Sequence, residues 1–254
     1  MSFHLIHWKS LDIMNWQPGQ IKINANIYYP SDDEHQGRFF VGTSLLLQHK
    51  DNLLQSNDPH YQDFIQKYNK ILPYTMLDYD RAFMLYQIAL LSQNLVGCTA
   101  ECGVYKGGSS ALIATLSPEK KHFALDTYEG MPDIISEIDS HKQGDFSPPK
   151  KNSLDSLFEQ LPNIYKIKGP FHKTFHTIKD NIFSFVYVDA DLYQSTLECC
   201  EFFYPRLTFG GMMLFDDYLQ KSTRGVKKAV DEFFGEQKTR PIVLPTNQAI
   251  VYRI

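Results

Sequence analysis

The chain has 254 residues, of which 43% are hydrophobic and 21% charged, a composition typical of a folded globular protein and not of a disordered one. A formal net charge of −4 gives no electrostatic basis for binding nucleic acid or an anionic membrane. The apolar stretches are too short to span a bilayer or to form the core of a signal peptide, and the four cysteines form no zinc-like array. We therefore expect a cytoplasmic protein with reduced thiols.

The first seventy residues are weakly patterned, and we expect them to form an N-terminal extension, on the substrate side or at an oligomer contact. Within them, Ile21–Pro30 alternates like a strand, and Asp58-Pro59 is typical of a helix start. One large domain is predicted over residues 71–254. It opens with a helical segment over residues 77–95, whose predicted core-facing side carries Met84, Ile88, Leu91 and Leu95.

Beyond this helix, short apolar runs alternate with helix-like segments, a pattern typical of a parallel sheet with helices on both faces. The last two apolar runs, RPIVLP and QAIVYRI, are separated only by a short turn at Pro245–Asn247. Strands joined so closely pair antiparallel. The sequence therefore predicts an α/β fold with a mostly parallel sheet and an antiparallel edge hairpin at the C-terminal end.

Two of the apolar runs, Phe185–Val188 and Met212–Phe215, end abruptly in carboxylates. The acids that follow them are Asp189, Asp191, Asp216 and Asp217. If the two runs are neighbouring parallel strands, all four acids emerge at one edge of the sheet, where they repel one another unless a cation or bound protons offset the charge. A divalent metal site is the leading interpretation, and oxygen ligands favour Mg²⁺ or Mn²⁺.

A plainer role is open to each of these acids. Asp216 and Asp217 are suited to capping the turn after a strand, and Asp191 to capping the helix that follows it.

A glycine-rich turn, Glu101–Ser110, lies between a predicted strand and a predicted helix, where open α/β sheets bind ligands. It is not a dinucleotide-binding turn, because Tyr105 stands where the second glycine is needed. Glu101 disfavours phosphates but suits a ligand with an ammonium and a sulfonium, such as S-adenosylmethionine. Asp126, at the end of the next strand, is placed to accept hydrogen bonds from ribose hydroxyls. The alternative is a helix start whose glycines serve only close packing.

With these residues in place, the chain resembles the macrocin O-methyltransferase family of class I, Rossmann-like methyltransferases. The resemblance covers residues 74–254, and the first seventy residues contribute nothing to it. The matching segments, in family order, are TMLDYDRAF (75–83), ECGVYKGGSS (101–110), LDTYEGMP (125–132), HKQGDF (141–146), KGPFHKTF (168–175), VYVDADLYQST (186–196), LTFGGMMLFDDY (207–218) and GVKKAVDEF (225–233).

The resemblance implies an enzyme dependent on S-adenosylmethionine and on Mg²⁺, or alternatively Mn²⁺, that methylates a sugar hydroxyl of a glycosylated natural product. It implies that Asp189, Asp216 and Asp217 hold the metal and that Asp191 is the general base. Family analogy also favours a homo-oligomer. The residues implied at the cofactor site are Glu101, Gly103, Val104, Tyr105, Gly108, Ser109, Asp126, Thr127 and Phe171. From its place in such a fold, the polar loop Tyr128–Asp145 is expected to cover the cofactor and to become ordered on binding.

Three other functions remain open from the sequence. The same metal geometry suits a catechol-like or other diol acceptor, and the aromatic content of 14% is compatible with one. A methyltransferase-like domain that binds a ligand or partner through its first seventy residues, without catalysis, would bind the cofactor but show no metal-dependent turnover. A nicotinamide-dependent oxidoreductase is the least favoured, for want of the second glycine after Gly103.

Overall fold

The computed structural model describes residues 59–132, 137–147 and 153–254. The chain divides into two compact units, Met1–Asp63 and Phe64–Ile254, and the boundary lies within helix α2 (Pro59–Ile71). The helix start predicted at Asp58-Pro59 is confirmed by the beginning of α2. The predicted strand Ile21–Pro30 lies outside the described residues. Of the helices in the described part, none has the length and apolar character needed to cross a membrane.

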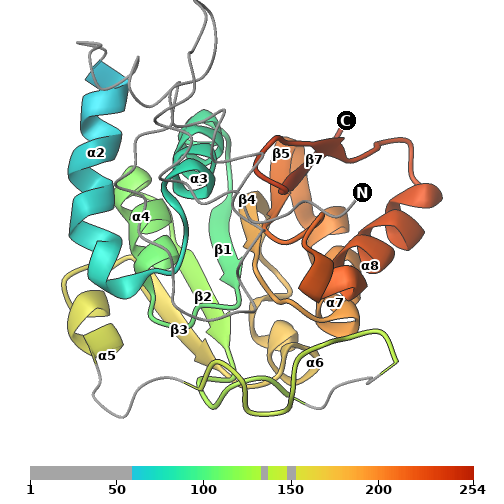
Figure 1. The fold of residues 1–254 in the computed structure, drawn as a ribbon. Helices are drawn as coiled ribbons and strands as arrows, with labels where there is room; N and C mark the ends of the chain where they lie inside the picture. Colours follow the sequence, from blue (N-terminus) through green and yellow to red (C-terminus); the bar gives the residue numbers. More distant parts are fainter. Residues whose placement is uncertain (1–58, 133–136, 148–152) are drawn as a thin grey trace, which may run out of the picture. The chain divides into compact units, whose positions relative to one another are not determined.

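The unit Phe64–Ile254 is built on a seven-stranded sheet with the strand order β3-β2-β1-β4-β5-β7-β6 (Figure 1). The first five strands in the chain pair in parallel, while β7 runs antiparallel to both β5 and β6. This arrangement confirms the predicted parallel sheet with an antiparallel edge. The strands are β1 (Cys98–Cys102), β2 (His122–Asp126), β3 (Ile164–Lys168), β4 (Phe183–Val188), β5 (Leu207–Phe215), β6 (Ile242–Val243) and β7 (Ala249–Tyr252).

Helices cover both faces of the sheet: α3 and α4 pack on one side, and α6, α7 and α8 lie on the other (Figure 1). The α-helices that follow α2 are α3 (Tyr79–Leu91), α4 (Gly108–Leu116), α5 (Ser153–Phe158), α6 (Phe171–Thr174), α7 (Tyr193–Phe203) and α8 (Arg224–Gly235). Short 3₁₀ helices occupy Leu72–Tyr74, Phe175–Ile178, Tyr204–Arg206 and Lys221–Thr223.

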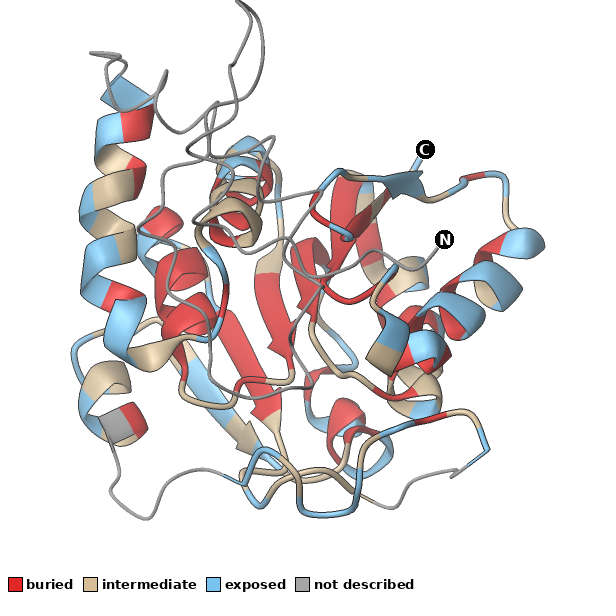
Figure 2. Cartoon of the chain, in the orientation of Figure 1, coloured by how far each residue is buried: buried red, intermediate tan, exposed pale blue. Residues whose placement is uncertain are grey.

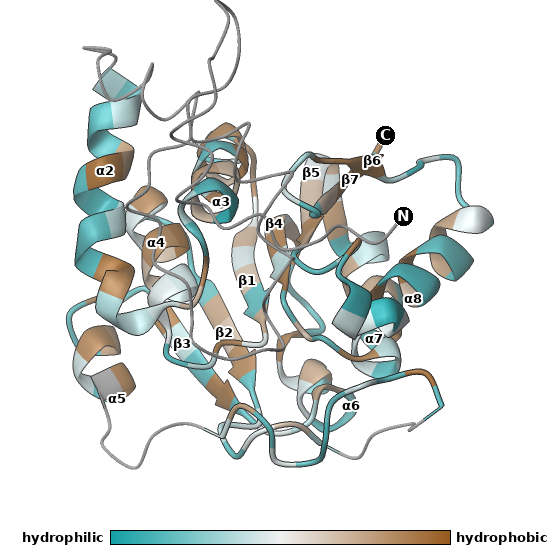
Figure 3. Ribbon diagram, viewed as in Figure 1, coloured by the Kyte–Doolittle hydropathy of each residue, from teal (hydrophilic) through white to brown (hydrophobic). Residues whose placement is uncertain are grey.

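The core lies along the central strands, which Figure 2 shows as buried and Figure 3 as largely apolar. All six residues of β4 are buried, as expected for a strand with helices on both faces. On the α7 side, the ring of Phe183 meets that of Phe203 edge-on at 4.9 Å between centroids. Burying one such aromatic side chain contributes roughly 1.5–3 kcal/mol, so this layer fixes α7 against the sheet.

The buried side of α3 differs from the predicted one. Leu85, Ile88 and Ala89 are buried, whereas Leu91, which was predicted to face the core, is 71% exposed. Of the four predicted residues only Ile88 is buried. The reason is that apolar side chains occur nearly all round this helix, so their spacing does not select one face.

The strand register aligns the carboxyl ends of β1, β4 and β5 along one edge of the sheet. Cys102 of β1 lies opposite Val188 of β4, and Val188 lies opposite Phe215 of β5. The backbone ladder continues one step further, because the N–H of Asp189 donates to the carbonyl of Cys102 (2.9 Å) and that of Asp216 to the carbonyl of Val188 (2.9 Å). The residues that follow β1, β4 and β5 therefore meet, as the sequence predicts for parallel neighbours.

Candidate active site

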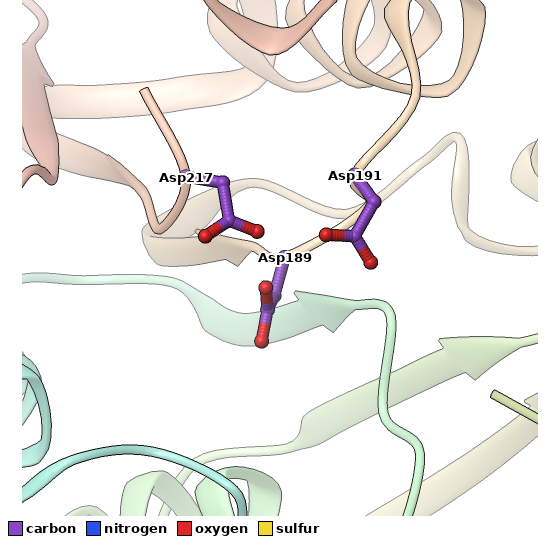
Figure 4. A group of neighbouring side chains, drawn as sticks. All are labelled: Asp189, Asp191 and Asp217. Atoms are coloured by element: carbon purple, nitrogen blue, oxygen red, sulfur yellow. The ribbon is translucent and has the colours of Figure 1, made fainter. Parts of the chain in front are cut away.

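Three carboxylates converge at this edge of the sheet. Asp189 and Asp191 follow β4 and are partly buried, while Asp217 follows β5 and is buried. Each offers an oxygen, and these oxygens lie within 4.8 Å of one another (Figure 4). Asp191 adopts a left-handed backbone conformation (φ 57°), which is uncommon for a residue other than glycine and turns the chain sharply before α7.

The fourth acid, Asp216, is engaged elsewhere. Its Oδ1 accepts a hydrogen bond from Nε2 of Gln248 (2.7 Å), and Gln248 is fixed in turn by the hydroxyl of Thr246 (2.7 Å). Its other oxygen forms an ion pair with Arg81. The structure therefore brings together Asp189, Asp191 and Asp217 and sets Asp216 beside them, so its role as a metal ligand stays a prediction.

Arg81 contacts the carboxylate cluster and was not predicted as a site residue from the sequence. It lies on α3, and its Nη2 donates to Oδ1 of Asp217 (2.5 Å) and to the backbone carbonyl of Asp216 (2.9 Å). The side chain is only 15% exposed. The sequence hint to Arg81 was its place in TMLDYDRAF, one of the segments that carry the family resemblance. One guanidinium offsets only part of the charge of four carboxylates.

Electrostatics at the cluster favour an added positive charge. Burial, together with the neighbouring acids, raises the pKa of Asp189 and of Asp191 well above the usual carboxyl range. Burial also raises the pKa of Asp216, to about 6, although Arg81 opposes the shift. Burial acts in the same direction on Asp217, but Arg81 and hydrogen bonds outweigh it, and the pKa of Asp217 is lowered. A set of oxygen donors that repel one another suits a hard divalent cation such as Mg²⁺ or Mn²⁺.

The capping role considered for Asp191 is not observed. The N-cap of α7 is Leu192, and it makes no side-chain capping bond. The free N–H of Tyr193 instead donates to Oδ1 of Asp139 (3.0 Å). Asp191 is therefore left to face the other two carboxylates.

The glycines of the turn after β1 are required by close backbone approach. A Cβ on Gly103 (φ 90°) would lie 1.9 Å from the carbonyl oxygen of Asp189, and one on Gly108 would lie 2.7 Å from that of Tyr74. Tyr105, between them, also has a positive φ of 49°. Close packing alone therefore explains why both positions are glycine, without a ligand. The same packing places the turn directly against the segment that carries Asp189.

Asp126 ties the turn to β2. Its Oδ2 accepts the N–H groups of Val104 (2.7 Å) and Tyr105 (3.0 Å), and its Oδ1 accepts that of Tyr128 (2.7 Å). Thr127, next in the chain, donates to the carbonyl of Gly130 (2.5 Å). Asp126 thus shapes the turn from the strand end where the sequence places a ribose-binding carboxylate.

Glu101 holds the other end of the turn. The side chain is fully buried and accepts hydrogen bonds from the hydroxyls of Ser109 (2.5 Å) and Ser110, in the first turn of α4. Burial raises the pKa of Glu101 to about 8, and the charges of Asp126 and Asp216 add to the effect. A positively charged ligand group near this carboxyl would therefore be stabilised.

Aromatic side chains flank the turn. Phe146, directly after the polar loop, lies edge-on to the ring of Tyr105 at 5.8 Å and to that of His141 in the loop at 5.5 Å. Phe171 opens α6, is 8% exposed and stacks on Phe175 at 5.5 Å. Phe146 therefore contacts the predicted cofactor segment and links it to His141 of the loop, whereas Phe171 belongs to the core.

His122 behind this turn predicts a pH dependence of stability. Burial lowers its pKa from 6.5 to about 3, so the unfolded chain takes up a proton that the folded protein does not. The neutral, buried His122 gives its full contribution to the free energy of unfolding above pH 6.5, and this contribution is lost as the pH falls towards 3. Between about pH 7 and about pH 4.5 the free energy of unfolding should fall by about 2.5 kcal/mol through this residue. Urea unfolding of the wild type and of His122→Gln at both pH values measures this fall in the free energy of unfolding. An equal fall in the two proteins would show that His122 is not its source.

Comparison with known proteins identifies the family. A model of the family described as macrocin-O-methyltransferase (TylF) matches residues 70–253. The chain is 25% identical over 145 residues to the 8-demethyl-8-(2,3-dimethoxy-alpha-L-rhamnosyl)-tetracenomycin-C 4'-O-methyltransferase of Streptomyces olivaceus, covering 51% of this chain and 56% of that protein. It is 23% identical over 206 residues to the demethyldecarbamoylnovobiocin O-methyltransferase of Streptomyces niveus, covering 73% of this chain and 78% of that protein.

Solved structures show the same fold. The O-methyltransferase NovP has a TM-score of 0.61 at 21% identity, over 71% of this chain and 82% of its own. The calicheamicin methyltransferase CalS11 has a TM-score of 0.59 at 20% identity, over 78% of this chain and 94% of its own. Because the family model covers most of the chain, including the glycine turn and all four acids, the chain belongs to the macrocin O-methyltransferase family.

Proposed function

We propose that this protein transfers a methyl group from S-adenosylmethionine to a hydroxyl of a sugar on a natural product, with the help of a divalent cation. The observation that carries the proposal is the convergence of Asp189, Asp191 and Asp217 beside the turn that follows β1. Family membership and the names of the two relatives, both O-methyltransferases and one of them named for a rhamnosyl substrate, support the reaction and the class of acceptor.

The cofactor half of the site would lie along the turn between β1 and α4. Glu101, with its raised pKa of about 8, favours a ligand that brings positive charge, as the ammonium and sulfonium of S-adenosylmethionine do. Asp126 stands at the end of β2, where ribose hydroxyls are bound in folds of this type. Solved neighbours include an O-methyltransferase of Bacillus cereus in complex with SAH and TomG of Streptomyces achromogenes in complex with SAM, at 15% and 14% identity.

The cation half would be held by Asp189 and Asp217, with Asp216 as the third ligand implied by the resemblance. A divalent cation at this position stabilises negative charge on a hydroxyl oxygen and orients neighbouring hydroxyls. Asp191 would accept the proton of the reacting hydroxyl, since it faces Asp189 and Asp217, and a cation held between them would favour its ionised form. Arg81 would keep Asp217 oriented through its 2.5 Å hydrogen bond.

Methyl transfer is an in-line displacement at carbon, so alignment of the acceptor oxygen with the methyl group supplies much of the rate. The short distance between the β1 turn and the segment carrying Asp189 supports this alignment, because Gly103 lies directly against the backbone of Asp189. A cofactor bound along the β1 turn would therefore lie next to the carboxylate cluster.

Transfer of a labelled methyl group tests the proposed function. Purified protein, labelled S-adenosylmethionine and Mg²⁺ would be incubated with rhamnosylated and other deoxysugar-bearing acceptors, and with catechols as the alternative class. We expect turnover on a glycosylated acceptor that EDTA abolishes and Mg²⁺ or Mn²⁺ restores. Turnover confined to catechols would overturn the acceptor class, and turnover insensitive to EDTA would overturn the role of the cation.

A further inference from the structure

A chain of buried polar side chains runs behind the glycine turn, from β1 through β2 to α4. The hydroxyl of Thr99 lies 2.9 Å from Nδ1 of His122, and Nε2 of His122 lies 3.1 Å from the hydroxyl of Ser110. Ser110 in turn donates to Glu101, which also accepts the hydroxyl of Ser109. Every one of these residues is buried, and His122 and Glu101 are fully so.

The direction of the hydrogen bonds follows from the donors available. When Glu101 is ionised, as a cationic ligand beside it would favour, the single hydroxyl proton of Ser110 goes to its carboxylate, so the Ser110 oxygen accepts from Nε2–H of His122. Nδ1 of His122 is then unprotonated and accepts from Thr99. His122 must be neutral for this arrangement, and burial holds its pKa at about 3.

The start of α4 depends on this chain because it has no ordinary cap. Its N-cap is Gly107, in a left-handed conformation (φ 88°), and no side chain at that position bonds to the first N–H groups of the helix. The hydroxyls of Ser109 and Ser110 both donate to the carboxylate of Glu101, and these two bonds hold the first helical turn against β1. Since Asp126 holds the other end of the turn through Val104 and Tyr105, its shape depends on two carboxylates.

We propose that His122 is a positioning residue for the cofactor: through Nε2–H it fixes Ser110, and through Ser110 it fixes the Glu101 carboxylate and the first turn of α4. This inference rests on the proposed function, since it concerns the same cofactor. His122 touches no ligand in this scheme and takes no part in methyl transfer. Among the described residues, the charged groups acting most strongly on Glu101 are Asp126 and Asp216, both of them acids, so the two serine hydroxyls are the groups that stabilise the ionised carboxylate.

Matched substitutions separate the two ends of the imidazole. In His122→Gln the side-chain amide reaches the position of Nε2 and keeps a donor for Ser110. In His122→Asn the shorter amide reaches only the position of Nδ1, so the contact with Thr99 is retained and that with Ser110 is lost. Thr99→Val removes the far end of the chain at nearly constant volume and serves as the control for lost stability.

Calorimetric titration of S-adenosylhomocysteine into each full-length variant, with thermal unfolding in parallel, tests the inference. We expect His122→Asn and Ser110→Ala to bind about tenfold more weakly than the wild type, as the loss of one buried hydrogen bond implies. His122→Gln and Thr99→Val should stay within about twofold, although Thr99→Val is less stable.

Two results would overturn the inference: wild-type affinity in both His122→Asn and Ser110→Ala, or a loss in Thr99→Val as large as that in His122→Asn, which would trace the effect to general stability. Failure of the wild-type protein to bind S-adenosylhomocysteine would be a different result, because it would sink the proposed function itself. Methyl transfer at saturating cofactor provides a second readout: kcat should be unchanged in His122→Asn while KM for the cofactor rises.

Discussion

Replacement of Asp191 by Asn should lower the rate of methyl transfer by about 10²- to 10⁴-fold, the range typical of a lost general base. The amide keeps the shape of the side chain but cannot accept the proton of the reacting hydroxyl. Affinity for S-adenosylhomocysteine should stay at the wild-type value, because the residue lies at the carboxylate cluster and not on the turn after β1. Steady-state kinetics and calorimetric titration of the same preparation measure the two quantities.

The same substitution should make the metal-free protein more stable. Ionised Asp191 is partly buried among acids, and its raised pKa shows that its charge is unfavourable there. Asp155→Asn is a suitable control, since Asp155 is an exposed acid on α5 that pairs with Lys166 at 2.6 Å; it should change neither rate nor affinity. Near-wild-type turnover by Asp191→Asn would remove Asp191 from the reaction.

Replacement of Arg81 by Met should be the most destabilising single change at the site. The variant leaves Asp216 and Asp217 buried without the guanidinium that contacts both of them. Removing one partner of a buried ion pair costs about 3–5 kcal/mol. Urea unfolding in EDTA should show a loss of this size, and added Mg²⁺ should recover more stability in the variant than in the wild type, because the cation then supplies the missing positive charge.

Arg206 offers a matched control for this prediction. It is partly buried like Arg81, but its guanidinium contacts the carbonyls of Lys179 and Phe202 (3.1 and 2.7 Å) and the ring of Phe202. Arg206→Met should therefore cost only about 1 kcal/mol, with no response to Mg²⁺. An Arg81→Met protein as stable in EDTA as the wild type would show that the cluster does not need the guanidinium.

The fold was predictable because its signals are local. Strand–helix alternation sets a parallel sheet, and the end of a parallel strand always meets the ends of its neighbours. The convergence of Asp189 and Asp191 with Asp217 follows from that rule and from the pairing of β4 with β5. The free, mostly buried thiols also agree with what the cysteine spacing predicts.

The partners of the cluster were not predictable, because they come from distant parts of the chain. Arg81 reaches Asp217 across 136 positions and Gln248 reaches Asp216 across 32, and no periodicity encodes such pairs. The prediction of the buried face of α3 was wrong for a different reason. Apolar residues surround this helix, so packing and not their spacing decides that Leu85 is buried and Leu91 exposed. The packing role considered for the glycines is observed at Gly103, which lies against the backbone of Asp189, whereas ligand binding by the turn stays a prediction.

The most direct test of the account is calorimetric titration of S-adenosylhomocysteine and, separately, of Mg²⁺ into the wild-type protein and into Asp189→Asn. Asp189 is the acid that faces Asp191 and Asp217, and its backbone lies against Gly103 of the glycine-rich turn after β1. We predict cofactor binding in both proteins and a Mg²⁺ signal, with cofactor present, that only the wild type gives. Absence of cofactor binding, or an equal Mg²⁺ signal in the variant, would contradict the proposed site.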